Sequence, residues 1–355
     1  MTTIRVDASR KYDVLIGDGL LDRAGGYIRD AAGGHIAAIV TDDVVAGIYP
    51  ERMNEALRGA GYETVIYKIK SGEASKNAYT YIRILDFLAE NRLTRSDVVV
   101  AFGGGVVGDL AGFAAATYMR GIHYAQIPTT LIAAVDSSIG GKTGIDLDMG
   151  KNIAGVFYQP SVVICDCDLI DSLPPRIFTD GCAEVIKYAM IADHGLFRML
   201  DDIPRPDLEA IITRCVSIKR DIVNEDEFES GARKLLNFGH TIGHAVEKLS
   251  GYKVSHGKAV AIGMAIETSI ALNMRLCGLD CYRDLIALLH VYGLPYQTRF
   301  GAAELAQAAL SDKKRRGDRI TLVFPKRIGK CTMRDIAVGD LEGVFSLGLD
   351  NAAAL

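Results

Sequence analysis

The sequence has 355 residues, 49% of them hydrophobic and 24% charged, with a formal net charge of -4 and a pI near 6.0. The length exceeds the roughly 250 to 300 residues at which a single core stops growing, so we expect two domains. The mildly acidic balance excludes a general affinity for nucleic acid or anionic membranes. Any anionic substrate must therefore be held by local positive charge.

Membrane insertion and secretion are not expected either. No apolar run approaches the ~18 residues of a membrane span, and the N-terminal segment lacks the apolar core of a signal peptide. The seven cysteines include no CxxC pair, which is typical of reduced thiols. We expect a cytoplasmic protein with neither membrane nor nucleic-acid partners.

Short β-branched runs alternate with helical patterns in the first half of the chain, which predicts a parallel α/β sheet. After Pro174 and Pro175 helical patterns predominate, so we predict an α/β domain over 1–172 and a mainly α-helical domain over 173–355. The predicted strands are 36–40, 64–69, 97–101, 124–127 and 162–165, with a possible hairpin at 319–324 and 330–334. The predicted helices of the second domain are 176–191, 207–225, 231–249, 258–276 and 280–291.

A glycine-rich turn follows the predicted strand 97–101. Gly103, Gly105 and Gly108 fit GxGxxG between a strand and a helix, where bare N–H groups can bind a pyrophosphate. The alternative is a turn required for packing alone. The turn follows a late strand and lacks the acidic residue of an ordinary Rossmann site. The candidates for that acidic contact are Asp42, Asp43 and Glu73, the last followed by Lys76.

The segment DSSIGGKTG resembles a phosphate loop but is not a Walker sequence, because Asp136 stands where glycine is required. We expect a flexible loop carrying Lys142 and a second one carrying Lys151 and Asn152. The two lysines are either solvated or reach an anion in a cleft between the domains.

A polar stripe is predicted in the second domain. Arg233, Asn237, His240 and His244 are spaced by four, three and four residues, so in one helix they share a face. His240 and His244 form an HxxxH pair that can bind zinc, and His256 lies beyond a turn from which it can join them. Alternatively, backbone and carboxylate groups satisfy these histidines.

An acidic and several basic residues could complete that site. Glu184 and Lys187 are three residues apart, so they either form a helical ion pair or supply a carboxylate for an open zinc site. Lys219 and the pair Lys313 and Lys314 add positive charge, although such a basic run is commonly a solvated turn.

Several long stretches occur in one order along the chain, among them GGGVVGDLAGF, QIPTTLIAAVDSSIGGKTGI, KNIAGVFYQP, DGCAEVIKYAMI, RKLLNFGHTIGHAVE and SHGKAVAIGM. Through these stretches the chain resembles the 3-dehydroquinate synthase family over nearly its whole length. The resemblance implies an N-terminal NAD-binding domain, a C-terminal α-helical zinc domain, an active site between them and a homodimer. It implies conversion of 3-deoxy-D-arabino-heptulosonate 7-phosphate into 3-dehydroquinate and phosphate by transient oxidation, elimination, re-reduction and aldol closure.

The resemblance also implies residue roles. Zinc, or cobalt in its place, would be bound by Glu184, His240 and His256, which leaves His244 to the substrate. Positions that match the NAD site are Asp42, Glu73, Lys76, Gly104, Gly105, Val106, Gly108, Asp109, Thr129, Thr130, Lys142, Lys151, Leu169 and Ser172. Positions that match the substrate site are Asp136, Lys142, Asn152, Lys187, Lys219, Arg233, Asn237, His244 and Lys313, with Arg120 joining from the partner subunit. Val44, Ile177 and Ser172 depart from the family at the nucleotide.

Three alternatives remain open from the sequence. A metal-dependent alcohol dehydrogenase would share the glycine turn and the histidines, but it has no use for Lys187, Lys219 and Arg233 near the metal. A sister sugar phosphate cyclase would change only the substrate pocket. A non-catalytic NAD- or metal-binding subunit is the third alternative.

Overall fold

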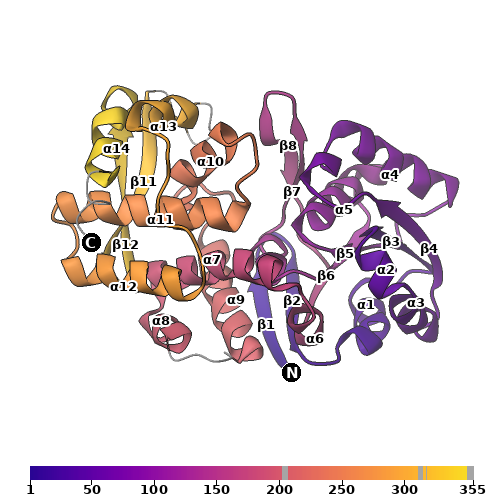
Figure 1. Ribbon diagram of the computed structural model, residues 1–355. Helices are drawn as coiled ribbons and strands as arrows, with labels where there is room; N and C mark the ends of the chain where they lie inside the picture. The colour runs from indigo at the N-terminus through magenta and orange to yellow at the C-terminus, as the bar shows by residue number, and fades with distance from the viewer. Residues whose placement is uncertain (202–206, 311–314, 317, 350–355) are drawn as a thin grey trace. The chain divides into compact units, whose positions relative to one another are not determined.

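The computed structural model describes residues 1–201, 207–310, 315–316, 318 and 319–349, which form two compact units (Figure 1). The first unit comprises Met1–Pro174 and Leu208–Phe228, and the second Pro175–Asp207 and Glu229–Leu355. The division predicted between residues 172 and 173 assigned helix α9 (Leu208–Glu225) to the second domain, whereas the structure groups it with the first. The reason is that α9 packs against β1 (Thr2–Asp7) and β2 (Lys11–Gly17) of the first unit.

A seven-stranded sheet forms the centre of the first unit, in the order β1-β2-β9-β6-β5-β3-β4. All neighbouring strands pair in parallel except β1 with β2, which pair antiparallel. The five strands predicted for this sheet are confirmed; β1 and β2 were not predicted. The strand bounds are β1 Thr2–Asp7, β2 Lys11–Gly17, β3 Ile36–Asp42, β4 Glu63–Ile69, β5 Val98–Gly103, β6 His123–Pro128 and β9 Val162–Asp166.

Helices cover both faces of this sheet, which explains why its central strands β5 and β9 are buried along their whole length. In β3, Ile39 belongs to one core cluster, with Ile28 and Leu57 of the helices, whereas Val40 belongs to another, with Leu88 and Leu110. The helices are α1 Ala24–Ala32, α2 Val45–Ile48, α3 Pro50–Gly59, α4 Ala78–Glu90, α5 Gly105–Thr117 and α6 Cys167–Asp171, besides α9.

The segments expected to be two flexible loops form an antiparallel hairpin instead, of β7 (Lys142–Leu147) and β8 (Gly150–Phe157). Gly144 and Gly155 face each other in it, and a Cβ on Gly155 would lie 2.2 Å from the carbonyl oxygen of Thr143. The glycines that suggested flexibility thus allow close pairing of two strands.

The second unit is mainly helical and is built around α11 (His256–Asn273), which is buried over most of its length. Helices α7, α10, α12 and α14 and strand β11 contact α11. The predicted hairpin at 319–334 is confirmed as β11 and β12. The other bounds are α7 Pro175–Ala192, α8 His194–Asp201, α10 His240–Leu249, α12 Leu279–Val291, α13 Ala302–Ala309, α14 Leu341–Leu349, β10 Arg315–Arg316, β11 Arg319–Arg327 and β12 Lys330–Ala337.

The helix predicted over 231–249 was wrong, because the segment is broken. A 3-10 helix, η5 (Ala232–Asn237), ends at Phe238, and α10 begins after Gly239. Phe238 has an extended ψ of 124° and Gly239 a left-handed φ of 76°, which no continuous helix contains.

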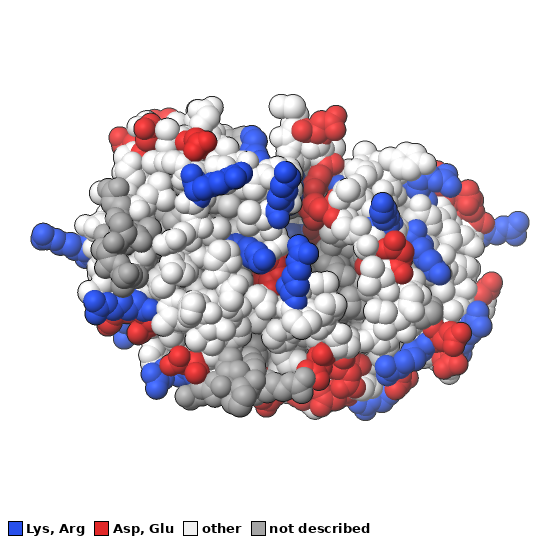
Figure 2. All heavy atoms as spheres, viewed as in Figure 1, with Lys and Arg blue, Asp and Glu red and all other residues white. Residues whose placement is uncertain are grey.

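Lys and Arg side chains are interspersed with Asp and Glu on the face seen in Figure 2, in keeping with the small net charge. Of the helices in the described part of the chain, none is long and apolar enough to cross a membrane. All seven cysteines lie in that part and are free thiols.

Candidate active site

Two imidazoles and a carboxylate converge in the second unit. Oε1 of Glu184 lies 3.4 Å from Nε2 of His240 and 3.2 Å from Nε2 of His256. One ligand atom from each of the three residues lies within 4.8 Å of the others, as binding of a single metal ion requires. This group contains the three residues that the family resemblance implied.

Three helices supply these side chains. Glu184 lies in the middle of α7, where its side chain is fully buried, while His240 and His256 are the first residues of α10 and α11. A residue at the start of a helix is placed by the backbone that precedes it, so the turns before α10 and α11 determine where the two imidazoles lie.

The remaining atoms of the three side chains have partners that orient them. His240 Nδ1 lies 3.0 Å from the carbonyl oxygen of Phe238, and His256 Nδ1 lies 3.6 Å from Oε2 of Glu247. Nζ of Lys187 lies 2.5 Å from Oε2 of Glu184, so Oε1 is the oxygen left to face the imidazoles. Such outer contacts fix the ring orientation of metal-binding histidines.

The electrostatics favour an ionised carboxylate at this point. Burial raises the pKa of Glu184, but Lys187 and His240 hold it well below its usual range. Burial lowers the pKa of His256, yet the hydrogen bonds with Glu184 and Glu247 outweigh it and raise the pKa to about 10. The negative charge of Glu184 is thus stabilised by the ammonium and imidazole groups around it.

Two nitrogens and one oxygen are one of the donor sets of catalytic zinc sites, which keep a coordination position for substrate. The buried Glu184 with a single oxygen directed at two Nε2 atoms fits such an ion. His244 belongs to a second group of possible ligands, with Glu247 and His256. In that group Nδ1 of His256 faces Glu247, whereas Nε2 of the same ring faces Glu184.

Arg233 and Asn237 do not share one helical face with His240 and His244, because the helix is broken at Gly239. Arg233 and Asn237 belong to η5; the side chain of Arg233 is 1% exposed, and Nδ2 of Asn237 donates to Oε1 of Glu229 at 2.7 Å. The ring of His244 lies 5.6 Å from that of His240. Lys313 lies outside the described residues.

In the first unit the glycine turn has the predicted context. Strand β5 ends at Gly103, and Gly104 precedes α5, whose N-terminus has no side-chain cap. Uncapped N–H groups at a helix start can bind an anion such as a pyrophosphate. A Cβ on Gly105 would lie 3.0 Å from Oγ of Ser137, and one on Gly108 2.6 Å from Oε1 of Gln126.

A buried network lies beside the turn. Nζ of Lys76, a residue 5% exposed, is 2.5 Å from Oδ2 of Asp109 and also donates to Oδ1 of Asn152. Nζ of Lys151 lies 3.8 Å from Oε1 of Glu73. The structure thus brings together five predicted site residues from α5, β8 and the segment after β4.

A second buried pair links α9 to the segment before the hairpin. Nζ of Lys219 is 2.8 Å from Oδ1 of Asp136 and 2.5 Å from the carbonyl oxygen of the same residue. Lys219 as a whole is only 4% exposed. Asp136 therefore supplies the opposite charge that a buried ammonium group needs.

The remaining predicted residues are more dispersed. Asp42 accepts hydrogen bonds from the N–H groups of Val44 and Val45 at 2.9 Å, and Arg120 is exposed with a left-handed φ of 65°. Lys142 is exposed at the start of β7. The others lie near strand ends or in α6: Thr129 and Thr130 after β6, Leu169 in α6, and Ser172, whose Oγ is 2.6 Å from Tyr49 Oη.

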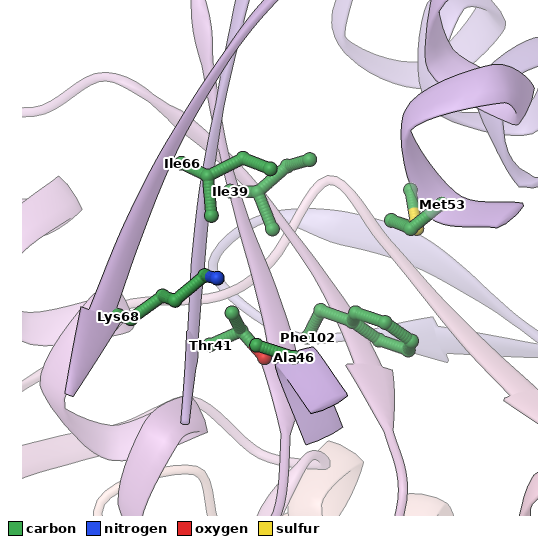
Figure 3. Close-up of a pocket in the computed structure, with 7 residues that line it drawn as sticks. All are labelled: Ile39, Thr41, Ala46, Met53, Ile66, Lys68 and Phe102. Atoms are coloured by element: carbon green, nitrogen blue, oxygen red, sulfur yellow. The ribbon is translucent and has the colours of Figure 1, made fainter. Parts of the chain in front are cut away.

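A small apolar cavity near the carboxyl ends of β3, β4 and β5 is separate from these residues (Figure 3). Its volume of about 10 Å³ has room for about one water molecule. It is lined by Ile39, Thr41, Ala46, Met53, Ile66, Lys68 and Phe102.

Three carboxylates around the cluster were not predicted: Asp180, Glu247 and Glu267. Glu247 follows His244 by three residues and therefore lies on the same face of α10, a spacing that could have identified it. Asp180 and Glu267 contact main-chain N–H groups of other segments, and the sequence holds no signal for such contacts.

Solved structures with this fold include a 2-deoxy-scyllo-inosose synthase complexed with carbaglucose-6-phosphate, NAD+ and Co2+, with a TM-score of 0.88, 26% identity, and coverage of 98% of this chain and 100% of that chain. A 2-epi-5-epi-valiolone synthase from Streptomyces hygroscopicus with NAD+ and Zn2+ bound has a TM-score of 0.86 and 28% identity, covering 96% and 98%. The fold class is that of dehydroquinate synthase-like sugar phosphate cyclases.

Within this class the family follows from sequence similarity. The family models for the N-terminal and C-terminal domains of 3-dehydroquinate synthase match residues 66–180 and 181–315. A 3-dehydroquinate synthase of Enterococcus faecalis is 45% identical over 345 residues, which cover 95% of this chain and 96% of that protein. The chain belongs to the 3-dehydroquinate synthase family.

Proposed function

We propose that the chain is a 3-dehydroquinate synthase, a lyase of aromatic amino acid biosynthesis that converts 3-deoxy-D-arabino-heptulosonate 7-phosphate into 3-dehydroquinate and phosphate. The observation that carries this proposal is the convergence of Glu184, His240 and His256 beside Lys187, in a chain 45% identical to curated enzymes of that name. The cofactors are NAD and a divalent metal, zinc or cobalt, as in the cyclase structures of the same fold.

Glu184, His240 and His256 would hold the metal, and the glycine turn of Gly104, Gly105 and Gly108 would hold the pyrophosphate of NAD. When bound, NAD supplies a reversible hydride acceptor and the metal a Lewis acid for the substrate's oxygens. The further NAD contacts proposed are Asp42, Glu73, Lys76, Val106, Asp109, Thr129, Thr130, Lys142, Lys151, Leu169 and Ser172.

The charged side chains divide the work of binding an anionic substrate. Arg233 would bind the carboxylate through its planar guanidinium, while lysines act as point charges for the phosphate. Lys187 keeps Glu184 ionised, and Asp136 holds Lys219 in a fixed position. The other substrate contacts proposed are Lys142, Asn152, Asn237, His244 and Lys313.

The proposed enzyme is a cytoplasmic homodimer in which Arg120 of one protomer completes the phosphate site of its partner. The free thiols support a reducing compartment. The shared phosphate site is supported by the exposure of Arg120, whose backbone has a left-handed φ of 65°. Mixing subunits that carry different inactivating substitutions would test this assembly.

A sister sugar phosphate cyclase, acting on a substrate without a carboxylate, is the second candidate, because the two solved structures described above are of sister cyclases. Their 26% and 28% identity contrasts with 45% for the curated 3-dehydroquinate synthase.

Phosphate release from the heptulosonate phosphate, measured with and without a chelator, tests the proposal. Release should require metal and only catalytic amounts of NAD, because the hydride returns to the substrate within each turnover. Accumulation of NADH in step with product would contradict the cyclase and favour a dehydrogenase.

A further inference from the structure

Asp180 connects two of the helices that carry the proposed metal ligands. It lies on α7 one turn before Glu184, and its Oδ1 accepts hydrogen bonds from Oγ of Ser255 at 2.5 Å and from N of Lys258 at 3.2 Å. Ser255 and Lys258 flank His256 at the beginning of α11. Asp180 and Glu184 therefore both contact the first turn of α11, one through its backbone and the other through the imidazole.

The backbones of the two helices are in close contact at the same place. A Cβ on Gly257, the residue after His256, would lie 1.9 Å from the carbonyl oxygen of Asp180 and 2.9 Å from its Oδ1. Glycine is thus required there for the observed approach of α11 to α7. The position of His256 relative to Glu184 depends on this contact and on the two hydrogen bonds of Asp180.

The hydrogen bonds at the start of α11 differ from those of an ordinary helix cap. A serine before a helix commonly accepts from the N–H three residues on, which here is that of Lys258. Ser255 makes no such bond, and Asp180 of α7 accepts from that N–H instead while the hydroxyl group of Ser255 donates to it. A carboxylate is also favoured at the positive end of the helix dipole.

We propose that Asp180 is a positioning residue for metal binding: it caps α11 from the neighbouring helix α7 and thereby places the imidazole of His256 opposite Glu184. The inference rests on the proposed metal site. Without Asp180, the hydroxyl of Ser255 can rotate and cap Lys258 itself, so α11 persists while its tie to α7 is lost. Removal of Asp180 should therefore weaken metal binding while changing the free energy of unfolding little.

Zinc affinity of the full-length protein provides the test. The metal is removed with a chelator and zinc is added back in competition with a chromogenic chelator. We expect Asp180→Ala to weaken zinc binding about 10-fold or more, the usual effect of removing an outer contact of a metal ligand. Asp180→Asn keeps an oxygen acceptor and should bind zinc within about 3-fold of the parent, since one neutral acceptor conserves the hydrogen bonds.

Asp193→Ala is the matched control. Oδ1 of Asp193 accepts from N of Leu196 at 3.0 Å at the start of α8, so the variant loses a comparable capping bond in the same unit, away from the cluster. Its zinc affinity should equal that of the parent. The visible spectrum of the cobalt-loaded protein should change in Asp180→Ala and remain unchanged in Asp193→Ala, because only the former alters the geometry at His256.

A double-mutant cycle shows whether Asp180 acts through His256. If it does, adding Asp180→Ala to His256→Ala should cause no further loss of zinc affinity. Unchanged zinc binding by Asp180→Ala would overturn the positioning role and leave the metal site intact, whereas a parent protein that binds no zinc would overturn the proposed site itself. Should Asp180→Ala fail to fold, Ser255→Ala takes its place. A several-fold loss of zinc affinity in Ser255→Ala would support the positioning role, and a zinc affinity equal to that of the parent would refute it.

Discussion

The main-chain N–H of Gly239 donates a 2.8 Å hydrogen bond to Oε2 of Glu267, a fully buried residue of α11. This bond lies at the break between η5 and α10, directly before His240. The chain is pressed against α11 there, since a Cβ on Gly239 would lie 2.7 Å from the carbonyl oxygen of Val260. Both imidazoles of the proposed metal site are therefore positioned relative to α11, His256 as its first residue and His240 through Gly239.

Substitution of Gly239 should consequently disturb both stability and metal binding. Gly239→Ala places a Cβ at a left-handed φ of 76° and against backbone atoms of α11. We expect a loss of about 3 kcal/mol or more in the free energy of unfolding, the sum of a strained backbone and overpacking. Denaturant unfolding and zinc titration are the measurements.

Gly251→Ala provides the control. Gly251 has a left-handed φ of 62° in the turn after α10, but nothing lies within 4 Å of an added Cβ. Only the backbone strain remains, so we expect a loss of about 1 kcal/mol. Equal losses in both variants would show that contact with α11 does not constrain Gly239.

Lys187 should matter most when the metal is absent. Its ammonium lies 2.5 Å from the carboxylate of Glu184, and neither residue is exposed by more than 1%. Lys187→Met removes that charge and should destabilise the metal-free protein by at least ~2 kcal/mol, because one partner of a buried pair remains. Zinc should restore stability, since the ion then compensates the charge of Glu184.

Thermal unfolding with and without zinc measures this rescue. Zinc should raise the Tm of Lys187→Met by more than it raises that of the parent. Lys330→Met, at an exposed lysine of β12, should respond to zinc as the parent does. A zinc-dependent shift of the same size in all three proteins would argue that Lys187 and the metal do not share Glu184.

Sequence patterns over a few neighbouring residues correctly predicted the parallel strands and the glycine turn. The β-branched runs predicted the parallel strands because those strands are buried on both faces, and the glycine turn was predicted because a strand and a helix flank it. The helix over 231–249 could not be excluded in this way, because its apolar spacing is compatible with α-helix. The break depends on the contact of Gly239 with α11, distant in sequence.

The candidate site shows the same division. The proposed metal ligands Glu184, His240 and His256 were named from family motifs, while the residue spacing alone favoured His240 with His244. The spacing argument assumed one continuous helix and no carboxylate from another. Asp180 and Glu267 were missed because each contacts a main-chain N–H, and a main-chain group leaves no trace in the sequence pattern. The membership of α9 in the first unit likewise depends on tertiary packing.

The stability of the first unit should depend on Asp97 in a pH-sensitive way. Its side chain is 2% exposed and accepts hydrogen bonds from the N–H groups of His35, Ile36 and Thr94 at 2.7 to 2.9 Å. Burial raises the pKa of Asp97, but these bonds outweigh it and bring the pKa below its ordinary value of 3.8. Stabilisation is then present above the unfolded-state pKa and is lost as pH falls through the folded-state pKa.

Asp97→Asn should therefore lose about 2 to 4 kcal/mol at pH 7, because an amide cannot accept at both ends and one buried N–H loses its partner. The difference from the parent should narrow as the pH falls below 3.8, where the unfolded parent becomes protonated at Asp97, and further as the pH falls through the lower pKa of the folded state. Urea unfolding at pH 7 and pH 3 measures both. Asp86→Asn, which removes an exposed pair with Arg83, should change stability little at either pH.

Arg233 should determine which substrate the enzyme accepts. It is among the largest fully buried side chains of the described residues and lies on η5, the segment that leads into His240. A planar guanidinium can bind a carboxylate through two hydrogen bonds, a geometry that the point charge of lysine cannot reproduce. The carboxylate of the heptulosonate phosphate is the substrate group that matches it.

We expect Arg233→Lys to lower kcat/KM for the heptulosonate phosphate by about 30-fold or more, which corresponds to the 2 to 5 kcal/mol of a lost pair in a closed site. The Tm and the zinc affinity of the same variant must remain close to those of the parent. A general loss of structure would lower both of these quantities together with activity. Sugar phosphates without the carboxylate should be poor substrates of the parent and should lose little further in the variant, since they offer nothing for the guanidinium to bind. If the parent turns over such sugars as well as the heptulosonate, or if Arg233→Lys retains full kcat/KM, then the carboxylate is not recognised here. The chain would then act as a sister cyclase despite its family.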